Sequence, residues 1–361
     1  MRFDSILIVL TEVCHVGCQH CGYIGSKRDR EVEAPEIERW IGEMVAYGIP
    51  EIIFTGGEAF ERYETLAAGV RRARECGARI SVFTSSFWAS SPAEARKVLQ
   101  GLQGLTKVYL STDIYHQKRV PLQYVRNAAD AAMDLGIRDI NINITYATEA
   151  DRDYVASQYA DYGDRVCIYA ERVIPSPKFS PKVLADQDPM RSLAPANYTR
   201  KCWLGTPLVD PQGDLFACHI GKAAAHKDFG KSSYFLGNLR AASFEKIMKQ
   251  AQQRSDYQFL RTHGPKGVAE MASNDTPLLK SMSRHEFTNA CDMCVCVLGS
   301  PQGPESLEKY AGAREDEINI RLALLLGESP TVQPGPPMFA NRNLPRNNDL
   351  VTISLAGQHS T

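Results

Sequence analysis

The sequence predicts an α/β fold built on a parallel sheet. Through about residue 170, apolar segments suited to buried strands alternate with amphipathic helical patterns. A helix between successive strands implies a parallel order with right-handed crossovers. The predicted strands are 5–10, 51–54, 79–84, 107–112, 138–145 and 165–170.

The helical pattern is clear in the segment 62–77. Its apolar residues recur at i, i+3, i+4 and i+7, and Gly77 follows the last turn, where a helix commonly ends. A stretch of this length between two strands predicts one of the crossover helices.

Composition narrows the class of protein. The chain has 361 residues, of which 43% are hydrophobic, enough for one large or two moderate domains. A formal net charge of -1 gives no reason to expect nucleic acid or an anionic membrane as a partner. Neither a membrane span nor a secretory signal is evident, so we expect a cytoplasmic protein. Its ten cysteines then indicate metal ligands rather than disulfides.

Three cysteines follow the first predicted strand. Cys14, Cys18 and Cys21 have the spacing CxxxCxxC. Such thiolates can hold three irons of a cubane iron–sulfur cluster and leave the fourth iron without a protein ligand. A zinc site, or thiols that are merely buried, is the alternative.

A strand, CxxxCxxC, and a second strand that ends in TGGE at 55–58 together resemble the radical S-adenosylmethionine (radical SAM) superfamily. The resemblance implies a partial (β/α)6 barrel with its chemistry at the C-terminal ends of the strands. It also implies a [4Fe-4S] cluster whose fourth iron binds SAM. Reduction by an external donor such as flavodoxin or ferredoxin then yields a 5′-deoxyadenosyl radical, which abstracts hydrogen.

The resemblance also implies residues that bind SAM. Gly56 and Gly57 would let the backbone approach its methionyl group, and Glu58 or a neighbouring carbonyl would accept from its ammonium. An ordinary turn is the alternative for the glycine pair. His20 stands where the family usually has an aromatic residue near adenine, and Tyr23 is a possible substitute.

Polar residues at later strand ends are further candidates. By family position, Ser85, Ser111 and Asp113 would bind the carboxylate or ribose of SAM, and Lys118 or Arg119 would pair with the carboxylate. Helix capping is the alternative for the serines and the aspartate. Asn141 and Asn143 share one face of their strand, which the alternating isoleucines predict to be the inner face.

Cys167 lies on the sixth predicted strand. Its default interpretation is a small buried hydrophobic residue. A thiol that faces the barrel interior could instead donate a hydrogen atom to a substrate radical, as in the peptide epimerases of the superfamily.

A second group of cysteines lies in the C-terminal half. Cys202 and Cys218 flank a predicted hairpin at 207–218, which is followed by a short amphipathic helix at 243–250 and by a CxxC at Cys291 and Cys294. The layout resembles the auxiliary-cluster region called SPASM or, when truncated, twitch. A one-cluster twitch region with a second [4Fe-4S] is the better match, and a four-cysteine zinc site is the rival. Cys296 is left over, and an extended or turn geometry would let it approach the same metal.

The predicted organisation has four parts. Little regular structure is expected over the roughly 90 residues that the second metal would tie together. The parts are the barrel at 1–173, a Pro-rich linker at 174–200, the auxiliary domain at 201–327 and an extended or disordered tail at 328–361.

The predicted function is that of a radical SAM enzyme. Auxiliary regions of this type most often accompany crosslinking, oxidation or epimerisation of a ribosomally made peptide. The sequence begins at the first barrel strand, so we expect no separate leader-peptide-binding domain, which keeps open a small-molecule substrate such as a carbohydrate or aminoglycoside. A non-catalytic iron–sulfur or zinc protein is the alternative from another class.

Overall fold

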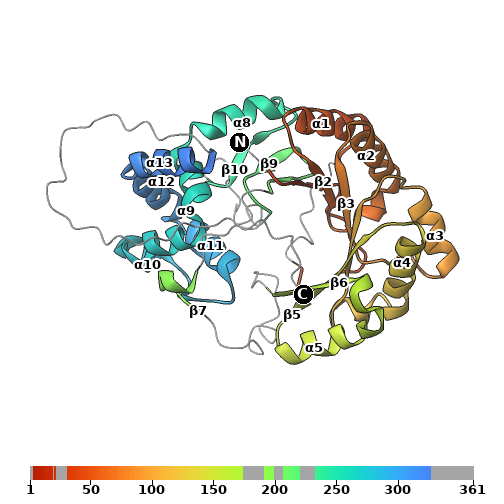
Figure 1. The fold of residues 1–361 in the computed structure, drawn as a ribbon. Helices are drawn as coiled ribbons and strands as arrows, with labels where there is room; N and C mark the ends of the chain where they lie inside the picture. Colours follow the sequence, from red (N-terminus) through yellow and green to blue (C-terminus); the bar gives the residue numbers. More distant parts are fainter. Residues whose placement is uncertain are drawn as a thin grey trace.

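A computed structural model of the chain describes residues 3–18, 20–21, 31–173, 191–198, 206–219 and 232–326. Its centre is a curved sheet with helices on the outer side (Figure 1). Six parallel strands pair in chain order, each with the next. They are β1 (Ile6–Val9), β2 (Glu51–Thr55), β3 (Arg79–Thr84), β4 (Lys107–Ser111), β5 (Asp139–Tyr146) and β6 (Cys167–Arg172).

A helix connects each strand to the next one described. The prediction of alternating strands and helices over the first 170 residues is therefore confirmed. The helices are α1 (Ala34–Ala46), α2 (Tyr63–Glu75), α3 (Pro92–Gln100), α4 (Leu122–Asp134) and α5 (Glu149–Ser157). Short 3₁₀ turns add η1 (Ala59–Arg62), η2 (His116–Lys118) and η3 (Ala160–Arg165).

The strand register separates an apolar outer face from a polar inner face. Ile8, Phe54, Val82, Val108 and Ile140 lie in one row and are buried in the main core against the helices. Burial of these large apolar side chains between strands and helices contributes most of the free energy that stabilises the barrel.

The inner face is polar because the alternate residues point the other way. Its rows include Tyr109, Asn141 and Cys167, and then Ser111, Asn143 and Tyr169. At the N-terminal ends of the strands, oppositely charged side chains form ion pairs. Lys107 Nζ, for example, lies 2.9 Å from Asp139 Oδ2. The inner face thus leaves polar side chains free to meet a ligand towards the other end of the strands.

The predicted hairpin of the second half is also confirmed. Strands β8 (Leu208–Val209) and β9 (Asp214–Phe216) pair antiparallel around a turn, and β10 (Phe235–Asn238) pairs with β9. Within the described residues, β8 also pairs parallel with β1, so the hairpin extends the barrel sheet to nine strands. The predicted boundary near residue 201 therefore does not divide the sheet.

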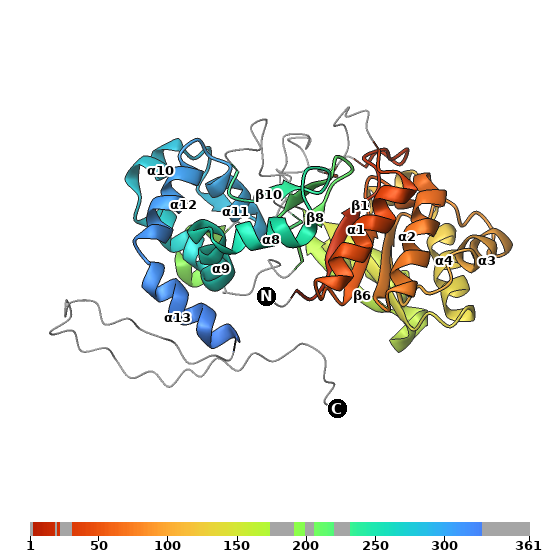
Figure 2. The same ribbon diagram turned by 90° about the horizontal axis from the view of Figure 1, so that it is seen from above.

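Helices make up most of the remaining C-terminal part. They gather apart from the barrel, and α8 and β10 lie between (Figure 2). The bounds are α8 (Phe244–Gln252), α9 (Ser255–Ser273), α10 (Thr276–Ser281), α11 (Ala290–Leu298), α12 (Gly303–Gly312) and α13 (Glu315–Leu326).

One prediction for this half is wrong. From residue 244 on, the segment expected to have little regular structure is mainly helical, because α9 buries residues on every side and the other helices pack around it.

The predicted linker contains two short elements. Strand β7 (Arg191–Ser192) pairs with β11 (Glu286–Phe287), and η4 (Pro195–Asn197) follows it. The rest of the linker and the whole of the predicted tail lie outside the described residues.

Candidate active site

The loop that carries Cys14, Cys18 and Cys21 leaves the C-terminal end of β1. Gly17, with φ of 62°, takes the left-handed conformation that a side chain would disfavour, and Cys21 N donates to Cys18 O at 3.2 Å. Cys18 is buried, whereas Cys14 and Cys21 are half-buried. Burial raises the pKa of the Cys14 thiol. A nearby positive charge would be needed to favour its thiolate.

The TGGE segment holds this loop through backbone contacts. Gly57 N donates to Thr11 O at 2.7 Å, and Glu58 N donates to Val13 O at 2.9 Å. A Cβ on Gly57 would lie 2.3 Å from Val13 O, and one on Gly56 would lie 2.7 Å from Thr11 O. The close packing of the cysteine loop therefore requires glycine at both positions. The sequence had suggested only one reason for these glycines, a close approach to SAM.

The Glu58 side chain is engaged within the protein. Its Oε2 accepts from Ser85 N at 2.7 Å and from Ser85 Oγ at 2.6 Å, while Oε1 accepts from Phe60 N at 3.2 Å. Complete burial raises the pKa of Glu58, although these hydrogen bonds oppose the shift. The two side chains thus bond to each other and join the ends of β2 and β3, and their contact with SAM stays a prediction.

Asp113 is likewise satisfied by its neighbours. Its Oδ1 accepts from the backbone N–H groups of Tyr115 and His116 at 2.8 and 2.9 Å, and its Oδ2 lies 2.7 Å from His116 Nδ1. His20 Nε2 lies 3.5 Å from the same oxygen. Asp113 therefore contacts two histidines in this structure, and its contact with SAM stays a prediction.

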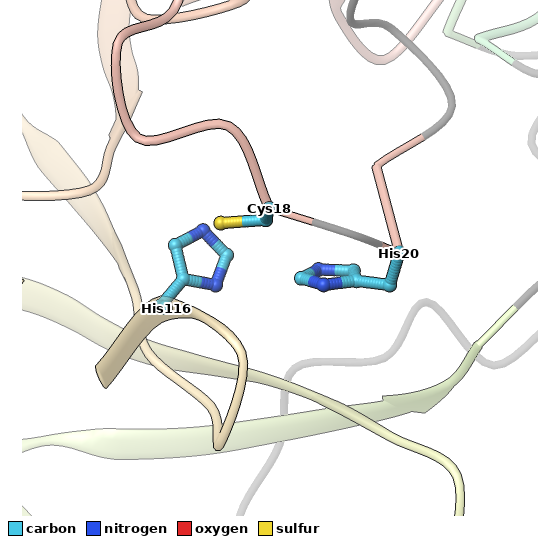
Figure 3. Close-up of side chains that lie close together, drawn as sticks. All are labelled: Cys18, His20 and His116. Carbon is cyan, nitrogen blue, oxygen red and sulfur yellow. The ribbon is translucent and has the colours of Figure 1, made fainter. Parts of the chain in front are cut away.

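Those two histidines meet the cysteine loop. The side chains of Cys18, His20 and His116 face one another (Figure 3), and one ligand atom from each lies within 4.8 Å of the others. Although burial opposes the shift, Asp113 raises the pKa of His116 well above its usual value, whereas burial lowers that of His20 to about 4. The two histidines beside Cys18 therefore have pKa shifts of opposite direction.

His20 packs against aromatic rings of the protein. Its ring centroid lies 4.7 Å from that of Tyr115 and 5.2 Å from that of His116. Its place beside adenine stays a prediction. The possible substitute Tyr23 lies outside the described residues.

Two unsatisfied polar atoms mark the C-terminal ends of the strands. Asn143 Oδ1, on the inner face of β5, and Ser86 Oγ, just after β3, are buried without a hydrogen-bond partner among the described residues. Ser86 also has φ of 66°, which is uncommon for a residue other than glycine. Buried polar atoms usually have partners, so both fit a polar ligand at this end. Asn141 shares the inner face, but its Nδ2 donates to Asp139 Oδ1 at 2.7 Å.

The remaining barrel candidates lie in different surroundings. Ser111 is half-buried in the same inner row as Asn143. Arg119, which follows η2, is exposed. Lys118, the last residue of η2, is also exposed, and its Nζ lies over the Tyr115 ring. Cys167 is exposed at the N-terminal end of β6, ~16 Å from the other end of that strand at 3.3 Å per residue. The predicted role of Cys167 as a hydrogen donor to a substrate radical stays a prediction.

The later cysteines lie on two elements. Cys218 follows β9 and is buried. Cys291 and Cys294 lie three residues apart on α11, so they share a face of that helix. Burial and the Glu171 carboxylate raise the pKa of Tyr169 on β6, and Cys291 contributes in the same direction. Cys202 lies outside the described residues.

Cys296 is separated from the pair by the helix. The expectation of an extended or turn geometry is wrong, because Asn289 caps a regular helix by accepting from Asp292 N at 2.9 Å. Two residues along a helix correspond to a rotation of about 200°. Cys296 Sγ accordingly lies 3.8 Å from Ser283 Oγ and from Arg284 O. We therefore leave Cys296 out of the proposed ligands.

The donor set of the N-terminal loop fits a cluster better than a single zinc ion. Around tetrahedral zinc, sulfurs at about 2.3 Å from the metal lie about 3.8 Å apart. In the described part of the chain, Cys14, Cys18 and Cys21 do not form a group within 4.8 Å. Three soft thiol donors spread more widely suit the corners of an iron–sulfur cubane.

His116 was not among the residues expected at the site. A signal for it is present in the sequence, since Asp113 and His116 lie three apart in STDIYHQKR after a predicted strand. That spacing lets an aspartate cap a turn and hold the histidine in it. The proximity of His116 to Cys18, which lies 98 residues earlier in the chain, has no such local signal.

Fold and site together define a partial α/β barrel with a thiol-rich loop at the C-terminal ends of its strands. Residues 8–157 match the model of the Radical SAM superfamily, so the chain contains a radical SAM domain. The domain supports an enzyme that uses SAM, and the superfamily implies a [4Fe-4S] cluster. None of the curated proteins matches the chain.

Several solved structures are similar to this chain at low identity. One is native anSMEcpe with bound AdoMet and Cp18Cys peptide, at 14% identity and a TM-score of 0.49, covering 89% of this chain and 99% of that one. Another is Streptococcus suis SuiB bound to precursor peptide SuiA, at 11% identity and a TM-score of 0.45, covering 82% of this chain and 76% of that one. Dihydrodipicolinate synthase from Oceanobacillus iheyensis has 12% identity and a TM-score of 0.31, covering 87% and 97%.

A membrane-spanning helix is not found in the part of the chain that the structure describes.

Proposed function

We propose that this protein binds a [4Fe-4S] cluster through Cys14, Cys18 and Cys21 and uses it to cleave SAM reductively. The cluster would supply the electron that converts SAM to methionine and a 5′-deoxyadenosyl radical, which abstracts hydrogen from a substrate. An external carrier such as flavodoxin or ferredoxin would deliver the electron.

The main support for this proposal is that the cysteine loop and TGGE contact each other within the matched domain. The cysteine loop and TGGE are hydrogen-bonded to each other from Thr11 to Glu58, at the C-terminal ends of β1 and β2. In parallel α/β folds, ligands bind at this end of the strands. A loop that only stored metal would not need the adjoining unsatisfied polar atoms of Ser86 and Asn143.

The residues proposed to bind SAM follow from these contacts. The backbone of Gly56 and Gly57 would present its carbonyls, and Asn143 and Ser111 would face the ligand from the inner wall. By family position, Arg119 remains the proposed partner of the SAM carboxylate. Glu58, Ser85 and Asp113 would act by positioning, because their side chains are already engaged.

A second [4Fe-4S] cluster is proposed for the C-terminal part, with Cys202, Cys218, Cys291 and Cys294 as ligands. The shared helical face of Cys291 and Cys294 supports it. An auxiliary cluster there could accept an electron from a substrate radical.

We propose a peptide as the substrate, modified by crosslinking, oxidation or epimerisation. The inner wall supports this choice, because the β6 residues Cys167, Tyr169 and Glu171 are exposed. The hydroxyl of Tyr169 donates to the Glu171 carboxylate, so this wall offers both an aromatic ring and a charge to a polar chain.

Anaerobic incubation with SAM and dithionite tests the activity. We expect 5′-deoxyadenosine from the wild type and none from the triple variant Cys14→Ala, Cys18→Ala, Cys21→Ala. No 5′-deoxyadenosine from iron-loaded wild type would instead support a non-catalytic metal protein.

Mass measurement of candidate substrates then identifies the reaction. Loss of two hydrogens from a peptide indicates oxidation or crosslinking, and gain of one deuterium from heavy water indicates epimerisation. Turnover of a carbohydrate alcohol with no change in any peptide would contradict the peptide proposal.

A further inference from the structure

Within the described residues, the nine-stranded sheet ends in two edge strands, β10 and β6. An edge strand carries a row of backbone N–H and C=O groups that no neighbouring strand pairs with. Proteins usually cover or distort such a row, because it can pair with another chain. The two edges of this sheet differ in that respect.

The β10 edge is covered by the protein's own groups. Arg254 Nη1 donates to Phe235 O at 2.5 Å, and Arg254 Nη2 donates to Ser233 O at 3.1 Å. The pairing register also shifts between Phe235 and Gly237, which distorts the strand. A further strand therefore cannot extend the sheet at β10 without displacing these contacts.

At β6, alternate residues direct their backbone groups away from the sheet. The pairing with β5 continues just past the strand, where Val173 N donates to Tyr146 O at 2.9 Å. The N–H and C=O groups of one strand residue point to the same side, so the odd-numbered residues of β6 pair with β5. Ile168 and Ala170 therefore direct their N–H and C=O groups outward.

These outward groups form an open stretch of the edge. Among the described residues, the outward backbone groups of Ile168 and Ala170 have no hydrogen-bond partner. The next outward carbonyl is covered, since Asn289 Nδ2 of the α11 cap donates to Arg172 O at 3.5 Å. The segment 167–170 has no charged residue and no proline, which commonly protect an exposed edge. Strand β6 thus offers a short site for pairing that ends at α11.

The side chains at this site are apolar on both faces of the sheet. Ile168 is 40% exposed on the outer face, and Tyr169 is 39% exposed on the inner face. Tyr169 lies in the same inner row as Ser111 and Asn143, which are proposed to face SAM. Neighbouring strands lie about 4.8 Å apart, so a strand added to β6 would place an inward side chain about 10 Å from Asn143 along this row.

We infer that the peptide substrate docks in an extended conformation on the open edge of β6, through hydrogen bonds to the backbone of Ile168 and Ala170. The inference rests on the proposed function, since it takes the substrate to be a peptide that reacts beside SAM. In this mode of recognition the main-chain hydrogen bonds provide affinity and alternate side chains provide specificity. β-Branched and aromatic side chains of the peptide fit best beside Ile168 and Tyr169.

A second copy of this chain is the rival occupant of the edge. It is less favoured because only the short stretch 167–170 is open before α11 covers the edge at Arg172. In a symmetric pair of β6 strands, the α11 of each copy would lie beside the β6 edge of the other. A flexible peptide brings no such bulk to the site.

The probe for the test is a displayed library of random twelve-residue peptides, selected anaerobically on full-length, cluster-loaded protein with SAM. Selected peptides are synthesised, and their Kd is measured on the wild type and on Ala170→Pro. This substitution replaces an outward N–H by the proline ring but keeps the pairing with β5, in which that N–H takes no part. We expect binding to weaken about tenfold or more, as for the loss of one hydrogen bond.

Ala170→Val is the matched control. Valine is similar in size to proline and keeps the outward N–H, so the selected peptides should bind this variant as they bind the wild type. Circular dichroism of both variants checks that the fold is retained.

Methylation of the peptide tests the same pairing without any change in the protein. One isomer of each selected peptide carries N-methyl groups on odd-numbered residues, and the other carries them on even-numbered residues. Only one of these two sets of N–H groups can face β6, so one isomer should bind about tenfold or more weakly than the other. This comparison decides the question if Ala170→Pro does not fold.

The outcomes separate the two proposals. If iron-loaded wild type forms no 5′-deoxyadenosine from SAM, the proposed function itself fails. If it forms 5′-deoxyadenosine but the library yields no binding peptide, only the present inference is overturned. Equal Kd values for Ala170→Pro and Ala170→Val, or for the two methylated isomers, would overturn it as well. A dimeric wild type together with a monomeric Ala170→Pro would overturn it in favour of pairing between two copies.

Discussion

The two groups of cysteines in this protein are held in opposite ways. Cys14, Cys18 and Cys21 lie on an irregular loop that is held by backbone hydrogen bonds to TGGE. Cys291, Cys294 and Cys296 lie on the regular helix α11, whose period sets their directions. A loop can bring thiols at any spacing together, whereas a helix brings together only those three or four residues apart.

The difference explains where sequence spacing is informative. In the first group, all three cysteines remain candidates for one metal centre. In the second group, the helix separates Cys296 from Cys294 despite their closeness in sequence. Four predictions follow from this contrast between a loop held by tertiary contacts and a helix held by its own hydrogen bonds.

The largest effect is expected from removing the loop ligands together. The triple variant Cys14→Ala, Cys18→Ala, Cys21→Ala should lose about four irons per chain and all SAM cleavage, because no other described set of thiols lies at this end of the barrel. Iron and sulfide quantification with assay of 5′-deoxyadenosine measures both. SAM cleavage at the normal rate would place the catalytic cluster elsewhere.

Gly57→Ala should disrupt the loop nearly as strongly. Its Cβ would lie 2.3 Å from Val13 O, so the backbone that precedes Cys14 must move. We expect loss of most of the N-terminal iron, with the C-terminal iron retained, by Mössbauer spectroscopy.

Gly312→Ala is the matched control, since a Cβ there meets nothing within 4 Å. It should keep all iron. Full iron in Gly57→Ala together with a large loss of SAM affinity would instead make close approach to SAM the reason for this glycine.

The helical group should respond unequally to single substitutions. Cys294→Ala should lower the iron content by up to about four per chain and reduce solubility, whereas Cys296→Ala should retain both clusters. Iron and sulfide analysis of the two variants compares them. Full iron in Cys294→Ala with loss in Cys296→Ala would reverse the assignment, and stoichiometric zinc in anaerobically purified protein would overturn the auxiliary cluster.

The smallest effect is expected from the helix caps. Asn289→Ala removes the cap of α11 and should cost about 1 kcal/mol of helix stability. Iron should then leave the C-terminal cluster faster in the presence of a chelator. Ser91→Ala, which removes the cap of α3 in the barrel, should cost a similar amount and leave that rate unchanged. Equal rates in the two variants would mean that α11 does not hold the metal.

Much of the barrel was predictable from the sequence. The six strands and their order follow from apolar segments of strand length, and each observed strand lies within two residues of its predicted bounds. The hairpin at 207–218 and the helix at 243–250 were predictable for the same reason, because turn residues and the apolar period are local signals.

The C-terminal helices were harder to predict. In α9, apolar residues occur on all sides, and Gly264 and Pro265 interrupt the pattern. A helix that is buried all round shows no amphipathic period. Its position is decided by the helices that pack against it.

The sequence by itself determined the parallel barrel, the cysteine loop and the TGGE segment, because spacing and periodicity along the chain are enough to indicate them. Only the tertiary structure decided which polar side chains are free. It joined Glu58 to Ser85, turned Asp113 to His116, and brought His116 to Cys18. The physical reason is that a buried polar atom takes whichever partner the fold brings within hydrogen-bond distance, and that partner can be far away in the sequence.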